Sequence, residues 1–146
     1  MPSPASQSET LTRLEGVRVL VADDTPCVRQ ALTDILESAG AAVTAVGSAE
    51  AALTALQSER PDVLVSDLAM PQKDGYWLIG QVRALSQERG GATPAAALTA
   101  HGPEHRAGVL SAGFQCYVQK PLGICELVGI VALLALKEEI RCNSDS

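Results

Sequence analysis

The stretch V-R-V-L-V-A-D-D-T-P at residues 17–26 has the pattern of a strand, a turn and the start of a helix. Residues 17–22 form a short run rich in branched aliphatic side chains, which favours a buried strand. Asp23 and Asp24 follow, and Thr25 and Pro26 suit the N-cap and the first turn of a helix. The stretch therefore predicts a strand, an acidic turn and a helix in that order.

The residues after this stretch continue the same pattern. Apolar side chains recur at helical spacing up to Gly40, which suits a helix C-terminus: Val28, Ala31, Leu32, Ile35, Leu36 and Ala39. Strands are then expected at 42–46, 62–66, 94–98 and 115–118, and helices at 48–59, 76–87, 103–112 and 123–138. Five strand–helix units in alternation predict an α/β fold, a doubly wound five-stranded parallel sheet with helices on both faces.

Length and charge limit the classes of protein to consider. The 146 residues suffice for one domain, which we expect at 16–138, with a leader or linker at 1–15 and a short tail at 139–146. Eleven basic and seventeen acidic residues give a net charge of −6, which argues against nucleic acid as a direct partner. The opening residues lack the apolar core of a signal peptide.

The longest uncharged apolar run, residues 127–136, is shorter than the roughly 20 residues that a membrane helix needs. The four cysteines lack the spacing of a zinc site or a disulfide framework. We therefore expect a cytoplasmic protein that does not bind membranes.

Polar side chains stand where the predicted strands end. Asp23 and Asp24 follow the first strand, Asp67 the third, Thr99 the fourth and Lys120 the fifth. Ligands of such sheets bind beyond the carboxyl ends of the strands, so these groups should share one pocket. Three crowded carboxylates cannot all stay ionised without a cation or a bound proton, and oxygen ligands favour Mg²⁺. With Asp67 as nucleophile, the set suits phosphoryl transfer.

Residues from about 16 to 136 resemble a response-regulator receiver domain, the CheY-like branch of flavodoxin-like folds. The resemblance rests on four motifs in order: V-A-D-D at 21–24, S-D-L-A-M-P-Q-K-D-G at 66–75, A-L-T-A at 97–100 and Y-V-Q-K-P at 117–121. It implies that the protein belongs to a two-component phosphorelay, in which a receiver takes a phosphoryl group from a sensor histidine kinase or a histidine phosphotransfer protein.

The resemblance also assigns the metal ligands. It implies that Asp24 and Asp67 hold Mg²⁺ together with the backbone carbonyl of Ala69, whereas Asp23 acts largely through water. Mn²⁺ would be able to substitute for Mg²⁺. No other cofactor is expected, because no glycine-rich phosphate loop follows the first strand.

The remaining roles follow from the same resemblance. Asp67 would be the phosphoacceptor, Thr99 would hydrogen-bond the phosphoryl group, Lys120 would pair with its charge, and Tyr117 would be the aromatic switch. Such a domain is not an enzyme in the usual sense, because it catalyses only its own phosphorylation and dephosphorylation. Lys73, where the family usually has an apolar residue, departs from the family pattern.

Two alternatives remain. A Mg²⁺-dependent phosphatase or phosphotransferase also uses an aspartate nucleophile, although such enzymes usually carry a second acid at the position of Ala69. A receiver-like module that binds partners without phosphorylation is the other. The origin also stays open between a stand-alone regulator and the receiver of a hybrid sensor kinase, and L-E-G-V-R-V-L-V at 14–21 favours the hybrid kinase. We expect no effector domain after residue 138.

The last predicted helix has more apolar residues than one buried stripe requires. We therefore expect this helix either to be deeply buried or to mediate self-association or effector docking.

Overall fold

Strands and helices alternate along the chain in the order that the sequence predicts. The computed structural model describes residues 14–100, 106–120 and 126–135. Its strands are β1 (Arg18–Ala22), β2 (Ala42–Val46), β3 (Val63–Asp67), β4 (Ala95–Thr99) and β5 (Cys116–Gln119). Its helices are α2 (Pro26–Ser38), α3 (Ala49–Glu59), α4 (Gly75–Ala84), the short 3₁₀ helix η1 (Gln87–Arg89) and α5 (Arg106–Ala112), followed by a helical segment at 126–135.

The five strands form one sheet in the order β2-β1-β3-β4-β5, and every neighbouring pair is parallel. This arrangement confirms the doubly wound α/β fold. The order reverses direction at β1 and β3, which leaves their carboxyl ends adjacent at the switch point where such folds bind ligands. Pairing of Asp67 with Leu98 places the end of β3 next to the end of β4.

Local signals at the helix starts act as the sequence predicts. Thr25 is extended at the N-cap position and Pro26 begins α2, because a proline in the first turn loses no helical hydrogen bond; the Thr25 side chain itself makes no capping hydrogen bond. The Ser48 hydroxyl accepts a hydrogen bond from the backbone N–H of Ala51 at the start of α3. These starts keep the loops short at the carboxyl edge of the sheet.

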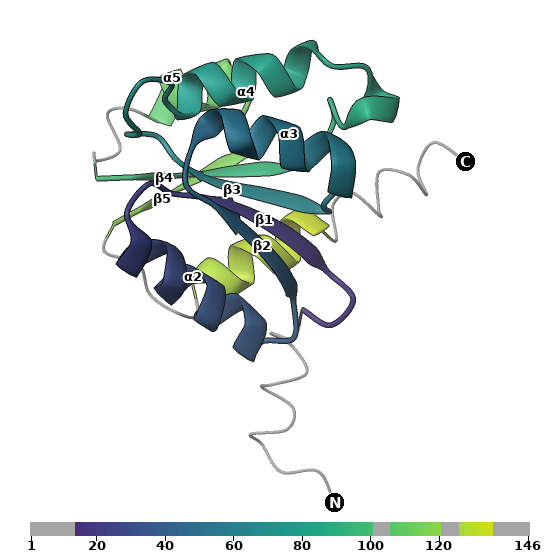
Figure 1. The fold of residues 1–146 in the computed structure, drawn as a ribbon, viewed down its shortest axis with the longest axis vertical. Coiled ribbons are helices and arrows are strands. Elements are labelled where there is room, and N and C mark those ends of the chain that lie inside the picture. Colours follow the sequence, from purple (N-terminus) through teal and green to yellow (C-terminus); the bar gives the residue numbers. More distant parts are fainter. Residues whose placement is uncertain (1–13, 101–105, 121–125, 136–146) are drawn as a thin grey trace, which may run out of the picture.

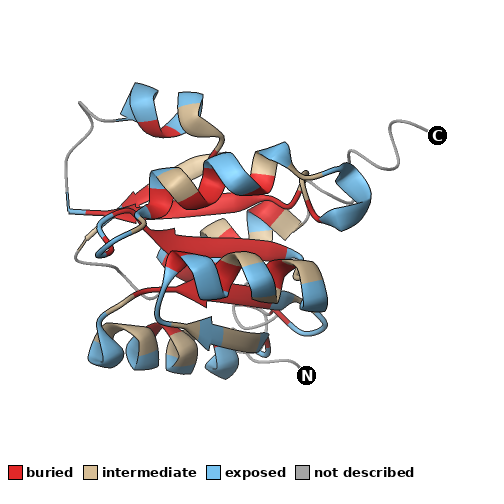
Figure 2. Ribbon diagram, turned by 45° about the horizontal axis from the view of Figure 1, so that its top comes forward, coloured by how far each residue is buried: buried red, intermediate tan, exposed pale blue. Residues whose placement is uncertain are grey.

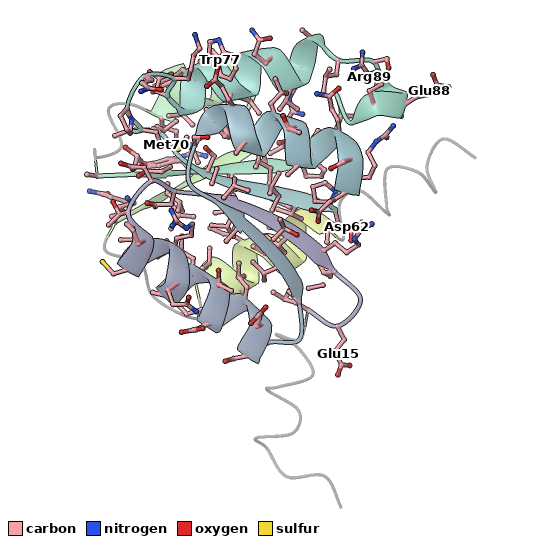
Figure 3. The ribbon with its side chains drawn as sticks, in the orientation of Figure 1. Glu15, Asp62, Met70, Trp77, Glu88 and Arg89 are labelled. Atoms are coloured by element: carbon pink, nitrogen blue, oxygen red, sulfur yellow. The ribbon has the colours of Figure 1, made fainter. Side chains whose placement is uncertain are left out.

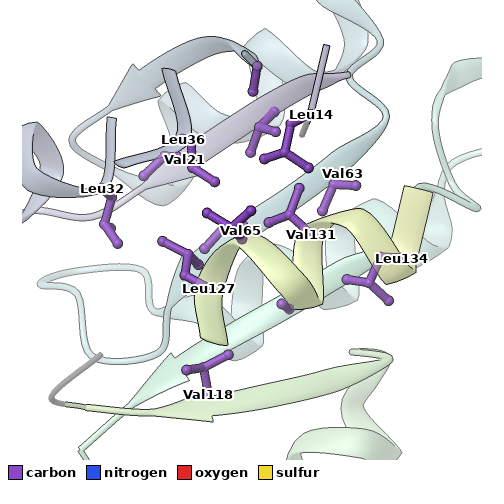
Figure 4. Close-up of a cluster of buried hydrophobic side chains, with 14 of the residues drawn as sticks. Leu14, Val21, Leu32, Leu36, Val63, Val65, Val118, Leu127, Val131 and Leu134 are labelled. Carbon is purple, nitrogen blue, oxygen red and sulfur yellow. The ribbon is translucent and has the colours of Figure 1, made fainter. Parts of the chain in front are cut away.

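Two apolar cores lie on opposite faces of the sheet (Figures 1 and 2). On one face, α2 and the segment 126–135 pack against alternate strand residues such as Val21, Val65 and Val118 (Figure 4). On the other face, α3, α4 and α5 cover Leu20, Leu64 and other strand residues. The central strands β3 and β4 are buried along their whole length, as expected of parallel strands covered on both sides.

The folded part extends further toward the N-terminus than we expect from the sequence. Leu14, which we place in the leader, is fully buried in the core beneath α2 and the segment 126–135. Its backbone N–H donates to the carbonyl of Ala39 at 2.7 Å. One buried leucine surrounded by polar residues has no periodicity, so its burial could not be predicted from the sequence.

Helix α4 ends at Ala84, three residues before the end that the sequence predicts. Leu85 is extended, and the chain folds back so that the N–H of Gly91 donates to the carbonyl of Ser86. A Cβ atom at Gly91 would lie 2.1 Å from the Leu85 carbonyl oxygen, so only glycine permits this approach.

The described part of the last helix has one buried face and one exposed face. Leu127, Val128, Val131 and Leu134 are buried, whereas Leu133 remains 52% exposed. The ends of the predicted helix, at 123–125 and 136–138, lie outside the described residues. Within the part of the chain that the structure describes, no helix combines the length and hydropathy of a membrane span.

Candidate functional site

The predicted polar side chains meet at the carboxyl edge of the sheet. Asp67 and Thr99 are the last residues of β3 and β4, and Lys120 directly follows β5. The backbone N–H of Lys120 donates to the Thr99 carbonyl at 2.7 Å, which ties the ends of β4 and β5 together. Asp23 and Asp24 follow β1 on the other side of β3.

Asp67 lies at the centre of this group. Its Oδ2 atom lies 3.2 Å from Lys120 Nζ, and its Oδ1 atom accepts a hydrogen bond from the backbone N–H of Ala69 at 3.1 Å. The Asp67 side chain is 7% exposed and that of Lys120 is 29% exposed. The carboxylate is thus oriented by two donors and still accessible from solvent.

Asp23, Asp24 and Asp67 form a compact acidic cluster. One carboxylate oxygen from each lies within 4.8 Å of the others. Asp23 is fully buried, and its Oδ1 atom accepts a hydrogen bond from the N–H of Thr25 at 2.9 Å. The Arg29 guanidinium donates to the Asp23 carbonyl oxygen at 2.8 Å, which holds the turn after β1 against α2.

The electrostatics of the cluster favour a cation. Burial raises the pKa of Asp23 above its usual 3.8, and the charges of Asp67 and Asp24 raise it further, against the opposing effects of the Thr25 N–H and Lys120. Its Oδ2 atom is buried without a hydrogen-bond partner among the described residues, and Lys120 Nζ is 3.8 Å away. An orphaned buried oxygen in a set of three carboxylates and one ammonium group fits a hard divalent cation such as Mg²⁺.

A cavity of about 510 Å³ opens above Asp67. It is lined by residues of the β3–α4 loop, the start of α4 and the ends of β4 and β5: Asp67, Leu68, Ala69, Met70, Asp74, Tyr76, Thr99, Ala100 and Lys120. Met70 lies at this edge of the molecule in Figure 3, opposite the edge that carries Asp62 and Glu88. The predicted nucleophile therefore lies in a solvent-connected pocket that a small phosphorylated group can enter.

Close backbone packing fixes the loop that carries Asp67 to the helix that follows. A Cβ atom at Gly75 would lie 2.6 Å from the Asp67 carbonyl oxygen and 2.9 Å from Leu68 Cα. The Asp74 carboxylate accepts from the N–H of Trp77 at 2.9 Å and caps α4. Gly75 therefore allows the start of α4 to lie directly against the end of β3.

Most of the sequence-predicted residues converge, but one lies apart. Asp23, Asp24, Asp67 and Lys120 are in mutual proximity, and Thr99 and Ala69 line the same cavity as Asp67. Ala69 contributes its N–H to Asp67, and a role for its carbonyl as a metal ligand stays a prediction. Tyr117 is half-buried within β5 and packs against the core beneath α4 and α5 rather than lining the cavity.

Five residues of the cavity lining were not among the predicted site residues: Leu68, Met70, Asp74, Tyr76 and Ala100. Tyr76 stands in the first turn of α4, nine positions after Asp67, and is 39% exposed. Its place at the start of the helix that follows the acceptor loop was the available signal. Tyr76 lines the pocket, and the sequence could not show this because it depends on how closely α4 approaches β3 at Gly75.

Comparisons with known proteins agree with this geometry. Residues 19–132 match the sequence model of the response regulator receiver domain. An uncharacterized 14.6 kDa protein of Leptolyngbya boryana is 44% identical over 124 residues, which cover 84% of this chain and 91% of that protein. The sensor histidine kinase GacS of Pseudomonas protegens is 34% identical over 128 residues, which cover 86% of this chain but 14% of the kinase.

Two solved structures have similar folds. The receiver domain of the Francisella response regulator 1452 has a TM-score of 0.77 and 30% identity, covering 84% of this chain and 99% of that one. The receiver domain of the sensor histidine kinase PA1611 of Pseudomonas aeruginosa has a TM-score of 0.75 and 30% identity, covering 82% and 98%. The latter structure contains a magnesium ion coordinated in its active-site cleft.

Proposed function

The chain belongs to the response regulator receiver domain family, and from this premise we propose that Asp67 accepts a phosphoryl group from the phosphohistidine of a partner protein. The partner would be a sensor histidine kinase or a histidine phosphotransfer protein. Phosphorylation would then shift an existing equilibrium between an inactive and an active conformation.

One observation carries this proposal. The Asp67 carboxylate lies at the base of an open cavity, 3.2 Å from the Lys120 ammonium group and within 4.8 Å of two further aspartates. A carboxylate in this setting combines a nucleophile with neutralising charge, whereas a structural turn aspartate requires neither.

Mg²⁺ is the cofactor that the donor set fits. Asp24 and Asp67 would hold it directly with the Ala69 carbonyl, and Asp23 would contribute mainly through water, which would satisfy its buried Oδ2 atom. A bound Mg²⁺ ion neutralises negative charge on the transferring phosphoryl group. Mn²⁺, which has similar ligand preferences, would substitute for it.

The residues of the chain have separate tasks in the transfer. A carboxylate oxygen of Asp67 attacks phosphorus and becomes part of an acyl phosphate. Lys120 Nζ, which neutralises Asp67 before transfer, is placed to pair with a phosphoryl oxygen after it. The Thr99 side chain is buried at the cavity wall and would donate a hydrogen bond to another phosphoryl oxygen.

The surface that signals phosphorylation to a partner would lie at β5 and the neighbouring helix α5. Tyr117 would move toward the cavity as Thr99 closes on the phosphoryl group, which would change the surface at α5 and β5. Leu133, which is 52% exposed on the last helix, would belong to the surface for self-association or effector docking. A cytoplasmic location is also part of the proposal, because the four cysteines of the sequence lack the spacing of a disulfide framework.

The test of the proposal is the intact mass of the protein after incubation with phosphoramidate and Mg²⁺. We expect a gain of one phosphoryl group that disappears in Asp67→Asn and when the metal is removed. Asp34→Asn, an exposed aspartate on α2, is the matched control and should be phosphorylated like the wild type.

Other outcomes have distinct meanings. Absence of a mass gain in folded protein, at times shorter than acyl phosphate hydrolysis, would contradict phosphorylation and support a binding module. Steady consumption of phosphoramidate without a trapped adduct would support the aspartyl-phosphate phosphatase alternative instead.

A further inference from the structure

The cavity above Asp67 is several times larger than the group that the proposed reaction transfers. Its volume is about 510 Å³. A phosphoryl group of four heavy atoms occupies on the order of 100 Å³ or less, because a single water molecule takes about 30 Å³ in the liquid. Most of the cavity therefore remains available to the rest of the phosphodonor.

The direction of attack determines where that remainder must lie. In phosphoryl transfer the attacking and leaving atoms are roughly in line through phosphorus. Since Asp67 attacks from the base of the cavity, the leaving group must point toward the mouth. The described lining residues that are exposed to solvent are Ala69, Asp74, Tyr76 and Ala100.

Tyr76 provides the large apolar surface among these mouth residues. It is 39% exposed, whereas Met70, which also lines the cavity, is 7% exposed. Ala69 and Ala100 contribute only small side chains to the lining. A tyrosine ring and a methionine side chain that line one cavity suit contact with a flat aromatic group.

We propose that Tyr76 and Met70 form a subsite that receives the leaving group of the phosphodonor and favours a planar heterocycle such as imidazole over a leaving group without a ring. The inference rests on the proposed function and deepens it, because imidazole is the leaving group of phosphohistidine. Tyr76 acts by contact with the departing ring and takes no part in proton transfer.

The transfer that the subsite would assist is balanced for two small donors. With N-phosphoimidazole, an Asp67 oxygen forms a bond to phosphorus, the P–N bond breaks, and its electron pair leaves with nitrogen as neutral imidazole. With phosphoramidate the same bonds form and break, and neutral ammonia leaves. In each case a singly charged zwitterionic donor and a carboxylate give a doubly charged acyl phosphate, so no other reactant is needed.

The leaving group of N-phosphoimidazole has an aromatic ring, whereas that of phosphoramidate has none. The experiment compares the two donors on the full chain with Mg²⁺. Fluorescence of Trp77, the single tryptophan, would follow the rate of phosphorylation, with intact mass as the end point. For Tyr76→Ala we expect kcat/KM with N-phosphoimidazole to fall by about threefold to tenfold, the range of one aromatic contact. The value for phosphoramidate should stay within about twofold of the wild type.

Two further variants test whether the aromatic ring of Tyr76 is responsible for the effect. Tyr76→Phe keeps the ring without the hydroxyl and should behave like the wild type with both donors. Thr54→Ala changes an exposed side chain on α3, away from the residues that line the cavity, and should leave both rates unchanged. Equilibrium binding of imidazole to the unphosphorylated protein, followed by Trp77 fluorescence, should weaken in Tyr76→Ala and not in Tyr76→Phe.

The outcomes separate this inference from the function on which it rests. Failure of the wild type to react with either donor would contradict the proposed function. An equal loss with both donors in Tyr76→Ala would show that Tyr76 merely supports the acceptor loop and would overturn the subsite. Loss in Tyr76→Phe would overturn the apolar contact in favour of a role for the hydroxyl.

Discussion

The two edges of the sheet differ in how completely their charged side chains are paired. At the carboxyl edge, the Asp23 carboxylate has an oxygen without a hydrogen-bond partner among the described residues. At the amino edge, the Arg83 guanidinium donates to the carbonyls of Gly113, Gly91 and Thr93 and to the side chain of Gln115, at 2.8–3.0 Å. The Asp23 carboxylate is therefore incompletely paired, whereas all three nitrogens of the Arg83 guanidinium donate hydrogen bonds.

The difference indicates which edge is built for a ligand. A buried polar group without a partner destabilises a fold, so it is retained where a ligand completes it. A guanidinium that joins the end of α4 to the segments before β4 and β5 needs no further partner to stabilise the protein. We therefore expect mutations at the amino edge to change stability and mutations at the carboxyl edge to change chemistry.

The largest stability effect is expected at the amino edge, from Arg83→Met. The substitution keeps much of the apolar stem but leaves several partly buried acceptors without a donor, so the free energy of unfolding should fall by about 3 kcal/mol. Urea unfolding would measure it. Arg89→Met, at an exposed arginine bonded to Gln57, is the control and should change stability by less than about 0.5 kcal/mol.

Phosphorylation of Arg83→Met by phosphoramidate should persist at temperatures where the variant remains folded. A stability loss below about 1 kcal/mol would mean that water replaces the guanidinium at little cost. The contrast between the two edges would then fail.

An intermediate effect is expected at the carboxyl edge, from Asp23→Asn. In the metal-free protein this change removes one crowded, buried charge and should raise the free energy of unfolding, because burial disfavours the ionised form and raises the pKa of Asp23. Mg²⁺ affinity, measured by calorimetry, should fall about tenfold or more. Asp34→Asn should change neither quantity, and a loss of metal-free stability in Asp23→Asn would contradict the interpretation.

The same variant tests the pH dependence. Because the pKa of Asp23 is raised in the folded state, mainly by burial, its contribution to stability is fully present below about 3.8 and is lost as pH rises through the folded-state pKa. The stability advantage of metal-free Asp23→Asn should therefore be small at low pH and grow toward neutrality. Saturating Mg²⁺ should reverse the sign at neutral pH, because it binds the native wild type more tightly.

The smallest effects are expected from two residues with positive φ, one near each edge. Gln72, at +69° in the acceptor loop, and Arg60, at +52° after α3, would each relax on replacement by glycine. We expect the free energy of unfolding of each variant, measured by thermal unfolding, to rise by about 0.5 kcal/mol. Relief of backbone strain should slightly exceed the cost of the greater entropy that glycine gives the unfolded chain. Only Gln72→Gly should alter phosphorylation kinetics; an equal kinetic effect of Arg60→Gly would remove the distinction.

Much of the site was predictable because its signals are local. Asp67, Thr99 and Lys120 follow runs of apolar residues, and parallel strands bring their carboxyl ends to one edge whatever the details of packing. The proximity of Asp23 to two other carboxylates follows from the same argument, whereas its full burial does not. The roles assigned to Thr99, Tyr117 and the Ala69 carbonyl remain predictions.

The sequence by itself determined the alternation of strands and helices, and thereby the fold and the set of residues at the carboxyl edge. Only the tertiary structure decided that Asp23 Oδ2 has no hydrogen-bond partner among the described residues, that Arg83 bonds segments up to 32 positions away, and that Tyr76 lines the cavity. The physical reason is range: periodicity and turn propensities act over a few residues. Hydrogen-bond satisfaction and cavity shape depend on how distant segments pack.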